Sequence, residues 1–221
     1  MTTGKSKKTI VSLLMATAIA APALSTQAFA DDGKSAGDLM VRGRVILVEA
    51  NESSTLSIGG EAEVDNAVVP ELDFTYFLTD NIGVELILAT TKHDVAALDT
   101  AVGDVDLGSI WLLPPTITLQ YHFNPKGDVS PYIGAGLNYT IFYNDDVPSS
   151  GPVNSIDYEN GFGLAIQAGL DWKVRDNWYV NLDVKKLLLN TDVSLDTALG
   201  GVSADVDIDP WIVGVGVGYK F

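Results

Sequence analysis

The sequence predicts an all-β fold, an eight-stranded antiparallel transmembrane up-and-down β-barrel. Three observations predict it. Apolar and polar residues alternate with a period of two, short and long connections follow one another strictly, and aromatic residues gather at two levels of the expected wall. The chain contains no cysteine, so disulfides cannot hold it together. A closed barrel needs none, because every strand is paired.

The first thirty residues are expected to be removed. Lys5, Lys7 and Lys8 make a basic start, residues 10–24 are apolar and uncharged, and residues 28–30 read Ala-Phe-Ala. This is the layout of a secretory signal peptide. An uncleaved membrane anchor is the alternative, but the apolar stretch is short for a span of ~20 residues. The expected organisation is therefore a signal peptide over residues 1–30 and a barrel domain over residues 31–221.

Alternation identifies the strands in order along the chain. The second strand shows it well, since Leu72 and Phe74 share one face while Glu71 and Asp73 share the other. The first strand is less regular. The eight expected strands span residues 39–48, 68–78, 82–91, 116–123, 133–141, 162–172, 178–185 and 211–221.

The polar face of each strand is expected to point into the barrel. Several glycines fall on this face, where they either leave space in a narrow lumen or let the strands bend. The residues expected to face the lumen are Glu71, Asp73, Glu85, Gln120, His122, Gly134, Gly136, Asn138, Gln167, Asp171, Asp183 and Lys185.

The connections differ in length and in charge. Three short turns lie at 79–81, 124–128 and 173–177, and four long loops are expected at 49–66, 93–109, 144–160 and 191–209. The long loops hold 18 of the 29 acidic residues and no Lys or Arg. Short periplasmic turns and long external loops are typical of outer-membrane barrels.

Aromatic residues mark both ends of the expected strands. Tyr121, Phe123 and Trp178 lie beside the short turns, while Trp111 and Trp211 lie toward the long loops. Amphipathic rings at two levels suit the two membrane–water boundaries. The alternative is that these rings are ordinary core residues.

Composition excludes two classes. Removing the signal peptide takes away three lysines and no acid, so the net charge changes from −16 to −19. Such a chain repels nucleic acid, and no nucleic-acid partner is expected. Disorder is also excluded, because 47% of the residues are hydrophobic and only 19% are charged.

Several segments resemble the OmpW family of outer-membrane proteins. The similarity spans residues 70–221, and the most specific segment is Pro-Tyr-Ile-Gly-Ala-Gly-Leu-Asn-Tyr at 131–139. The other shared segments lie at 76–85, 91–94, 113–123, 209–211 and 218–221.

The resemblance implies a location in the Gram-negative outer membrane, reached through the periplasm, and contact with outer-membrane lipid. It also implies a narrow passive channel for small hydrophobic solutes, which are released sideways through the wall. Tyr219 and Phe221 resemble the C-terminal signal that the outer-membrane assembly machinery reads. No cofactor is implied.

Other functions remain open. The inward charges favour a structural or adhesion-type barrel with a filled lumen and acidic external loops. An enzyme is not expected, although His93, Asp94 and Ser109 make a triad conceivable, because the chain lacks a Gly-x-Ser-x-Gly motif. The acidic pairs could attract hard cations, but none forms an EF-hand, and no metal site is expected.

Overall fold

The computed structural model describes residues 33–50, 52–56, 61–100, 103–148, 153–197 and 200–221. The expected signal peptide lies outside these residues. The described part of the chain forms fourteen strands, and it contains no helix long and apolar enough to cross a membrane.

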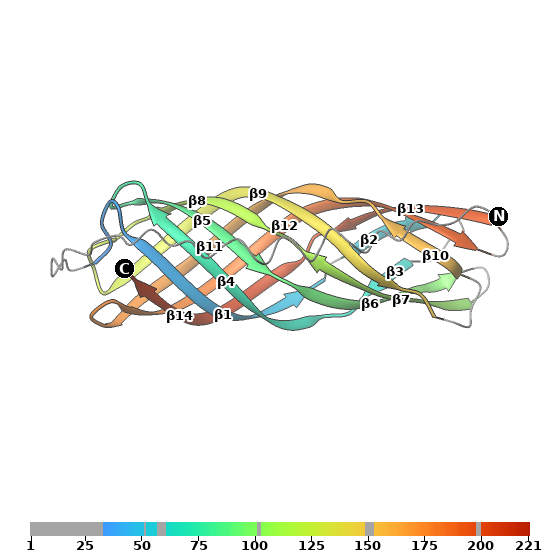
Figure 1. Ribbon diagram of the computed structural model, residues 1–221, viewed down its shortest axis with the longest axis horizontal. Coiled ribbons are helices and arrows are strands. Elements are labelled where there is room, and N and C mark those ends of the chain that lie inside the picture. Colours follow the sequence, from blue (N-terminus) through green and yellow to red (C-terminus); the bar gives the residue numbers. More distant parts are fainter. Residues whose placement is uncertain (1–32, 51, 57–60, 101–102, 149–152, 198–199) are drawn as a thin grey trace, which may run out of the picture. The chain divides into compact units, whose positions relative to one another are not determined.

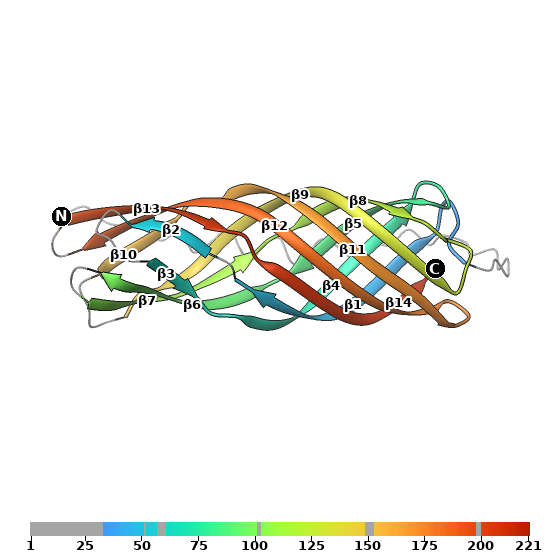
Figure 2. The same cartoon turned by 180° about the vertical axis from the view of Figure 1, so that it is seen from behind.

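Eight of the strands close into a ring in which each neighbour is antiparallel. The ring closes where β14 pairs with β1, with Val45 opposite Val215. The strands wind around the barrel with a common tilt (Figures 1 and 2), and the expected fold class is confirmed. In order around the ring they are β1 (Leu39–Glu49), β4 (Ala67–Phe77), β5 (Ile82–Ala89), β8 (Thr116–His122), β9 (Val129–Asp146), β11 (Gly161–Arg175), β12 (Trp178–Thr197) and β14 (Trp211–Lys220).

The outer face of the ring is apolar. Leu72, Ile117, Leu137 and Val215 are each more than two-fifths exposed, whereas their chain neighbours on the polar face are turned inward. A continuous apolar surface of this kind is unfavourable in water and suits the hydrocarbon of a bilayer.

The long connections are mostly strands instead of the expected loops. They continue the wall beyond the ring, because their sequences keep the period of two: Val193 and Leu195 are buried, whereas Asp192 and Asp196 are exposed. Figure 1 shows these strands at the end opposite the C-terminus; this end is called the long-connection end below. The added strands are β2 (Glu52–Leu56), β3 (Glu61–Val64), β6 (Thr91–Thr100), β7 (Gly103–Leu113), β10 (Val153–Tyr158) and β13 (Gly200–Ile208).

At the other end, the short-turn end, residues 33–38 lie against the turns. The backbone N–H of Lys34 donates to the carbonyl of Pro125 at 2.8 Å, and that of Gly37 donates to the carbonyl of Phe77 at 2.8 Å. The buried side chains of Met40, Phe77 and Tyr179 form a small core beside this segment. The segment therefore sits over the short-turn end of the barrel.

Candidate functional site

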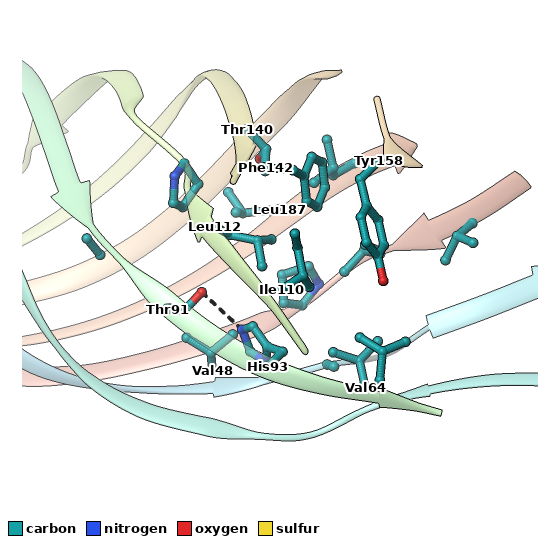
Figure 3. Close-up of a pocket in the computed structure, with 18 of the residues that line it drawn as sticks. Val48, Val64, Thr91, His93, Ile110, Leu112, Thr140, Phe142, Tyr158 and Leu187 are labelled. Carbon is teal, nitrogen blue, oxygen red and sulfur yellow. Dashed lines mark hydrogen bonds between the residues drawn. The ribbon is translucent and has the colours of Figure 1, made fainter. Parts of the chain in front are cut away.

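An apolar cavity occupies the long-connection half of the barrel. It has an empty volume of about 1200 Å³, part of which is open to solvent. Its upper wall is built from buried residues of the added strands, including Val95, Ile110 and Ile156, and of the end of β12, including Leu195. Figure 3 shows the side chains of Ile110, Leu112, Phe142, Tyr158 and Leu187 gathered around it. The arrangement can hold a small apolar molecule.

The lower wall of the cavity comes from the ring itself. Ile46, Val48, Leu187 and Ile212 are buried together on the inner faces of β1, β12 and β14. The wall therefore stays apolar as it passes from the added strands into the ring.

Two polar side chains of β6, Thr91 and His93, meet in the mainly apolar wall. The Nε2 atom of His93 lies 3.0 Å from Thr91 Oγ1 (Figure 3), and its Nδ1 atom lies 2.6 Å from the carbonyl oxygen of Asp65. Both ring nitrogens are thus engaged by the protein. Burial, and to a smaller extent the charge of Asp145, raises the pKa of the Tyr158 hydroxyl well above its usual range, so this wall residue stays neutral.

A network of buried charges, called the charged cluster below, fills the barrel beneath the cavity. Its members are almost entirely shielded from solvent, and each forms at least one ion pair with another. They are Lys34, Arg42, Arg44, Glu71, Asp73, Glu85, Asp171, Asp183 and Lys185.

Arg42 stands at the centre of the charged cluster. Its guanidinium lies 2.7 Å from Asp73 Oδ1, 2.8 Å from Glu85 Oε1 and 3.2 Å from Asp171 Oδ2. It also donates to Thr75 Oγ1 at 2.6 Å. A guanidinium presents five N–H donors in a rigid fork, so it can join several carboxylates at once.

Arg44 and Lys185 form the layer next to the cavity. Arg44 Nη1 and Lys185 Nζ approach the same atom, Oε1 of Glu71, at 2.7 Å and 2.9 Å. Lys185 also lies 2.9 Å from Asp183 Oδ1. Both Glu71 and Lys185 line the cavity, so together they form its floor.

Lys34 closes the charged cluster from the short-turn end. Its ammonium lies 2.7 Å from Asp171 Oδ2, 2.9 Å from His122 Nδ1 and 3.0 Å from Ser130 Oγ. Residues from the N-terminal segment, β8, β9 and β11 thus meet on one cation. Charged groups are stable when buried only if they are paired. The members of the charged cluster are paired and almost entirely shielded from solvent, so the cluster is a solid plug and not an open passage.

The residues expected to face the lumen fall mainly in the charged cluster and beside it. Gln120, His122, Asn138 and Gln167 are buried inside the ring with the acids and with Lys185. Gly134 lies opposite Gln120 and Gln167 in the register, so it shares their inward face. Tyr219 and Phe221 lie at the short-turn end, with their rings in edge contact at 4.8 Å.

The inward glycines accommodate polar side chains and do not widen an open lumen. A Cβ atom added at Gly169 would overlap the ring of Tyr132, and one added at Gly136 would overlap the backbone of Ile117 and Thr118. The sequence left two explanations open for these glycines, space in the lumen or bending of the strands. At Gly169 there is space, and the ring of Tyr132 fills it.

Sequence reasoning missed three cations of the charged cluster and most of the cavity wall. Arg42 and Arg44 alternate with Val41 and Val45, so the period of two could have placed them inside. The alternation of Val193 and Leu195 with acids carried the same signal. Nothing in the local sequence of Lys34 indicates burial, since it precedes the first strand.

The conceivable triad is not assembled. Asp94 and Ser109 are opposite one another in the ladder between β6 and β7, on the outer side, whereas His93 is turned inward. Among the described residues, no three acidic or histidine side chains converge as ligands for a metal ion.

Comparison with known proteins relates the chain to outer-membrane barrels. Residues 35–221 match the profile of the OmpW family. The chain is 44% identical over 190 residues to the uncharacterized outer-membrane protein y4mB of Sinorhizobium fredii, covering 86% of this chain and 81% of the relative. It is 33% identical over 227 residues to outer membrane protein W of Escherichia coli K12, covering 97% and 100%.

A solved structure agrees with these relatives. The crystal structure of the outer membrane protein OprG from Pseudomonas aeruginosa superposes with a TM-score of 0.81 at 32% identity, covering 86% of this chain and 98% of that one. The apolar outer face described above is the surface that such a barrel exposes to lipid. The chain therefore belongs to the OmpW family and is a β-barrel protein of the outer membrane.

Proposed function

We propose that this barrel is a narrow passive channel that admits small hydrophobic molecules to the outer membrane, without catalysing a reaction. The observation that carries the proposal is the apolar cavity at the long-connection end, which is partly open to solvent. The free energy of an apolar molecule falls when it leaves water for such a wall, by about 25 cal/mol per Å² of apolar surface that is buried. The cavity can therefore collect the molecule from outside.

The charged cluster dictates the direction of release. A hydrophobic molecule cannot pass through it without breaking buried ion pairs, and separating one such pair costs about 3–5 kcal/mol. The exit therefore leads sideways into the bilayer, where the molecule stays in an apolar surrounding.

An interruption in the wall supports the sideways exit. β4 and β5 are paired from Glu71 to Phe77, and in the described part of the chain no ladder joins residues 67–70 of β4 to β6. Pro70 lies there and has no N–H to donate. At this gap the outer face is apolar, since Val68 is 68% exposed there, so a released apolar molecule would leave through an apolar surface.

A relative provides a further argument. A protein of Pseudomonas aeruginosa, 34% identical over 167 residues, is named dibenzothiophene metabolism operon protein PahQ. Dibenzothiophene is a flat apolar aromatic compound, which is the class of solute that the cavity wall suits.

Uptake into liposomes tests the proposal. Protein refolded into liposomes is expected to speed the entry of a small apolar fluorophore, and Leu187→Trp, which fills the cavity, is expected to abolish most of the increase. The matched control is Leu188→Trp, because Leu188 is the next residue of β12 and is 43% exposed on the outer face. Equal loss in both variants, or no increase over empty liposomes, would contradict a channel through the cavity.

The second candidate is a structural or adhesion-type barrel. It is favoured by the plug of ion pairs, which fills the short-turn half of the barrel, and by the acids on the outer face of the added strands. It predicts no uptake in the same experiment, together with attachment to a surface that is lost when the exposed acids are replaced.

A further inference from the structure

We infer that the floor of the cavity is a binding subsite for a hydroxyl group, so that the preferred solute is an apolar molecule ending in a neutral alcohol or phenol. This inference rests on the proposed function and names its substrate class. It is drawn from the two charged side chains that line the mainly apolar cavity, Glu71 and Lys185.

The carboxylate of Glu71 has one engaged and one unengaged oxygen. Arg44 and Lys185 both donate to Oε1, and in the described part of the chain Oε2 has no hydrogen-bond partner. The side chain is only 2% exposed, and it lines the cavity. A carboxylate oxygen with so little access to water favours a ligand that brings a donor.

The ammonium of Lys185 provides the complementary group. It has three N–H donors. One donates to Glu71 Oε1 at 2.9 Å, and the ammonium also forms an ion pair with Asp183 Oδ1 at 2.9 Å. At least one N–H is left for a ligand that accepts. A hydroxyl group both donates and accepts, so a single hydroxyl can satisfy Glu71 and Lys185 together.

The neighbouring threonines do not compete for this role. The hydroxyl of Thr116 donates to the carbonyl of Pro114 at 3.0 Å, and that of Thr140 donates to Asn138 Oδ1 at 2.7 Å. Both hydrogens are already used within the protein, so neither hydroxyl can donate to the ligand. As an acceptor for the hydroxyl of the ligand, the charged carboxylate of Glu71 is stronger than either threonine oxygen.

The charges around the cavity favour a neutral hydroxyl group over a carboxylate as the ligand. The charged cluster contains four cations and five carboxylates, which gives it a formal net charge of −1. The outer face of the long-connection end adds exposed acids such as Asp94, Asp192 and Asp207. An anionic head group would meet repulsion at both places, whereas a neutral hydroxyl would not.

A pair of isomers isolates the donor. Octanol and heptyl methyl ether contain the same atoms, but only the alcohol can donate a hydrogen bond. Each is titrated by calorimetry into the full barrel in nanodiscs, and partitioning into empty nanodiscs is subtracted. The expected result is that octanol binds about tenfold more tightly than the ether, and that octanoate binds more weakly than octanol.

The variant Glu71→Gln tests the assigned atom. The amide oxygen can replace Oε1 between Arg44 and Lys185, which leaves an NH₂ group in place of Oε2. The preference for octanol over the ether is expected to vanish, while the ether binds as before. The control is Leu187→Ala, which should weaken both isomers by the same factor and keep their ratio.

The possible results separate this inference from the proposed function. Equal affinities for the two isomers in the unmodified protein, or tighter binding of octanoate, would overturn the hydroxyl subsite and leave the channel standing. Failure of both isomers to bind would overturn the channel as well. The comparison in the unmodified protein decides the matter even if Glu71→Gln does not fold.

Discussion

At the scale of single residues, Arg42 shows how the buried charges depend on one another. Its guanidinium contacts three carboxylates and a hydroxyl within 3.2 Å. A carboxylate left without such a partner inside the barrel would lose both its ion pair and its hydration. Each cation of the charged cluster is therefore needed because the acids are present.

Arg42→Met is expected to lower the free energy of unfolding by about 3–5 kcal/mol, since three buried carboxylates lose a partner. Urea unfolding of the refolded barrel in lipid vesicles measures the change. Arg175→Met is the control, because Arg175 and Asp176 form an ion pair that is more than four-fifths exposed, and such pairs contribute at most ~1 kcal/mol. Equal effects of the two substitutions would refute a central role for Arg42.

The glycine at position 169 has a different residue-scale role. Tyr132 packs over it, and the Tyr132 hydroxyl donates to Asp183 Oδ2 at 2.6 Å and accepts from Asn181 Nδ2 at 3.1 Å. These hydrogen bonds hold the ring in place, so it cannot move aside for a methyl group without losing them.

Gly169→Ala is expected to destabilise the barrel by about 1–3 kcal/mol through overpacking. Gly43→Ala provides the comparison within another ring strand, because an added Cβ at Gly43 meets no atom within 4 Å; its effect should stay within about 0.5 kcal/mol. The same urea titration measures both. A neutral Gly169→Ala would show that the Tyr132 ring is not confined as described.

At the scale of elements, the wall changes character where β9 leaves β11. Their ladder ends at Thr140 and Gly161. Beyond it β9 pairs with β7, β10 pairs with β12, and no ladder joins β9 to β10 within the described residues. The stacked rings of Phe142 and Tyr158, 5.4 Å apart at 17°, bridge this seam, which side chains therefore close in place of backbone hydrogen bonds.

Phe142→Ala is expected to raise the hydrogen-exchange rates of the amides of β10 by about tenfold, because an aromatic pair adds ~0.5–1.5 kcal/mol beyond the burial of its surface. Phe162→Ala is the control: Phe162 also contacts another ring, that of Tyr139, but across the intact ladder between β9 and β11. Mass spectrometry of exchanged peptides measures both. Unchanged exchange in Phe142→Ala would mean that the ring pair does not close the seam.

For the whole molecule, β14 and Phe221 lie where the ring closes against β1. The backbone N–H of Phe221 donates to the carbonyl of Leu39, at the start of β1. The ring of Phe221 is 60% exposed on the outer face beside Tyr219. The expected C-terminal assembly signal would require such an exposed aromatic pair.

Deleting Phe221 is expected to reduce the amount of barrel in the outer membrane several-fold. Phe123→Ala is the matched control, because Phe123 and Tyr121 form a similar exposed edge-on pair, 5.2 Å apart, within the chain. Quantitative blotting of outer-membrane fractions measures the folded form. An equal loss of folded barrel in both variants would indicate a general need for aromatic anchors. A normal amount of folded barrel after the deletion would contradict a role for Phe221 as an assembly signal.

The number of ring strands, their order and the direction of their side chains could all be predicted from the alternation along the chain. The period of two is a local property of a strand. The inward direction of Glu71 and Asp73 could therefore be predicted without knowing which residues they meet. The same property holds for the added strands. In these segments the alternation was harder to recognise, because a run such as residues 191–209 contains more acids than are expected in the wall of a barrel.

The alternation does not tell which inward residues meet or where the barrel is open, because both depend on how the strands come together in the folded barrel. Lys34 and Asp171 are 137 positions apart, and their contact arises only because the ring closes and residues 33–38 lie over one end of it. Charges gather into a plug because each needs a partner away from water, and this leaves the apolar residues to line the cavity. The division of the barrel into a filled half and a hollow half follows from that pairing, which no local pattern contains.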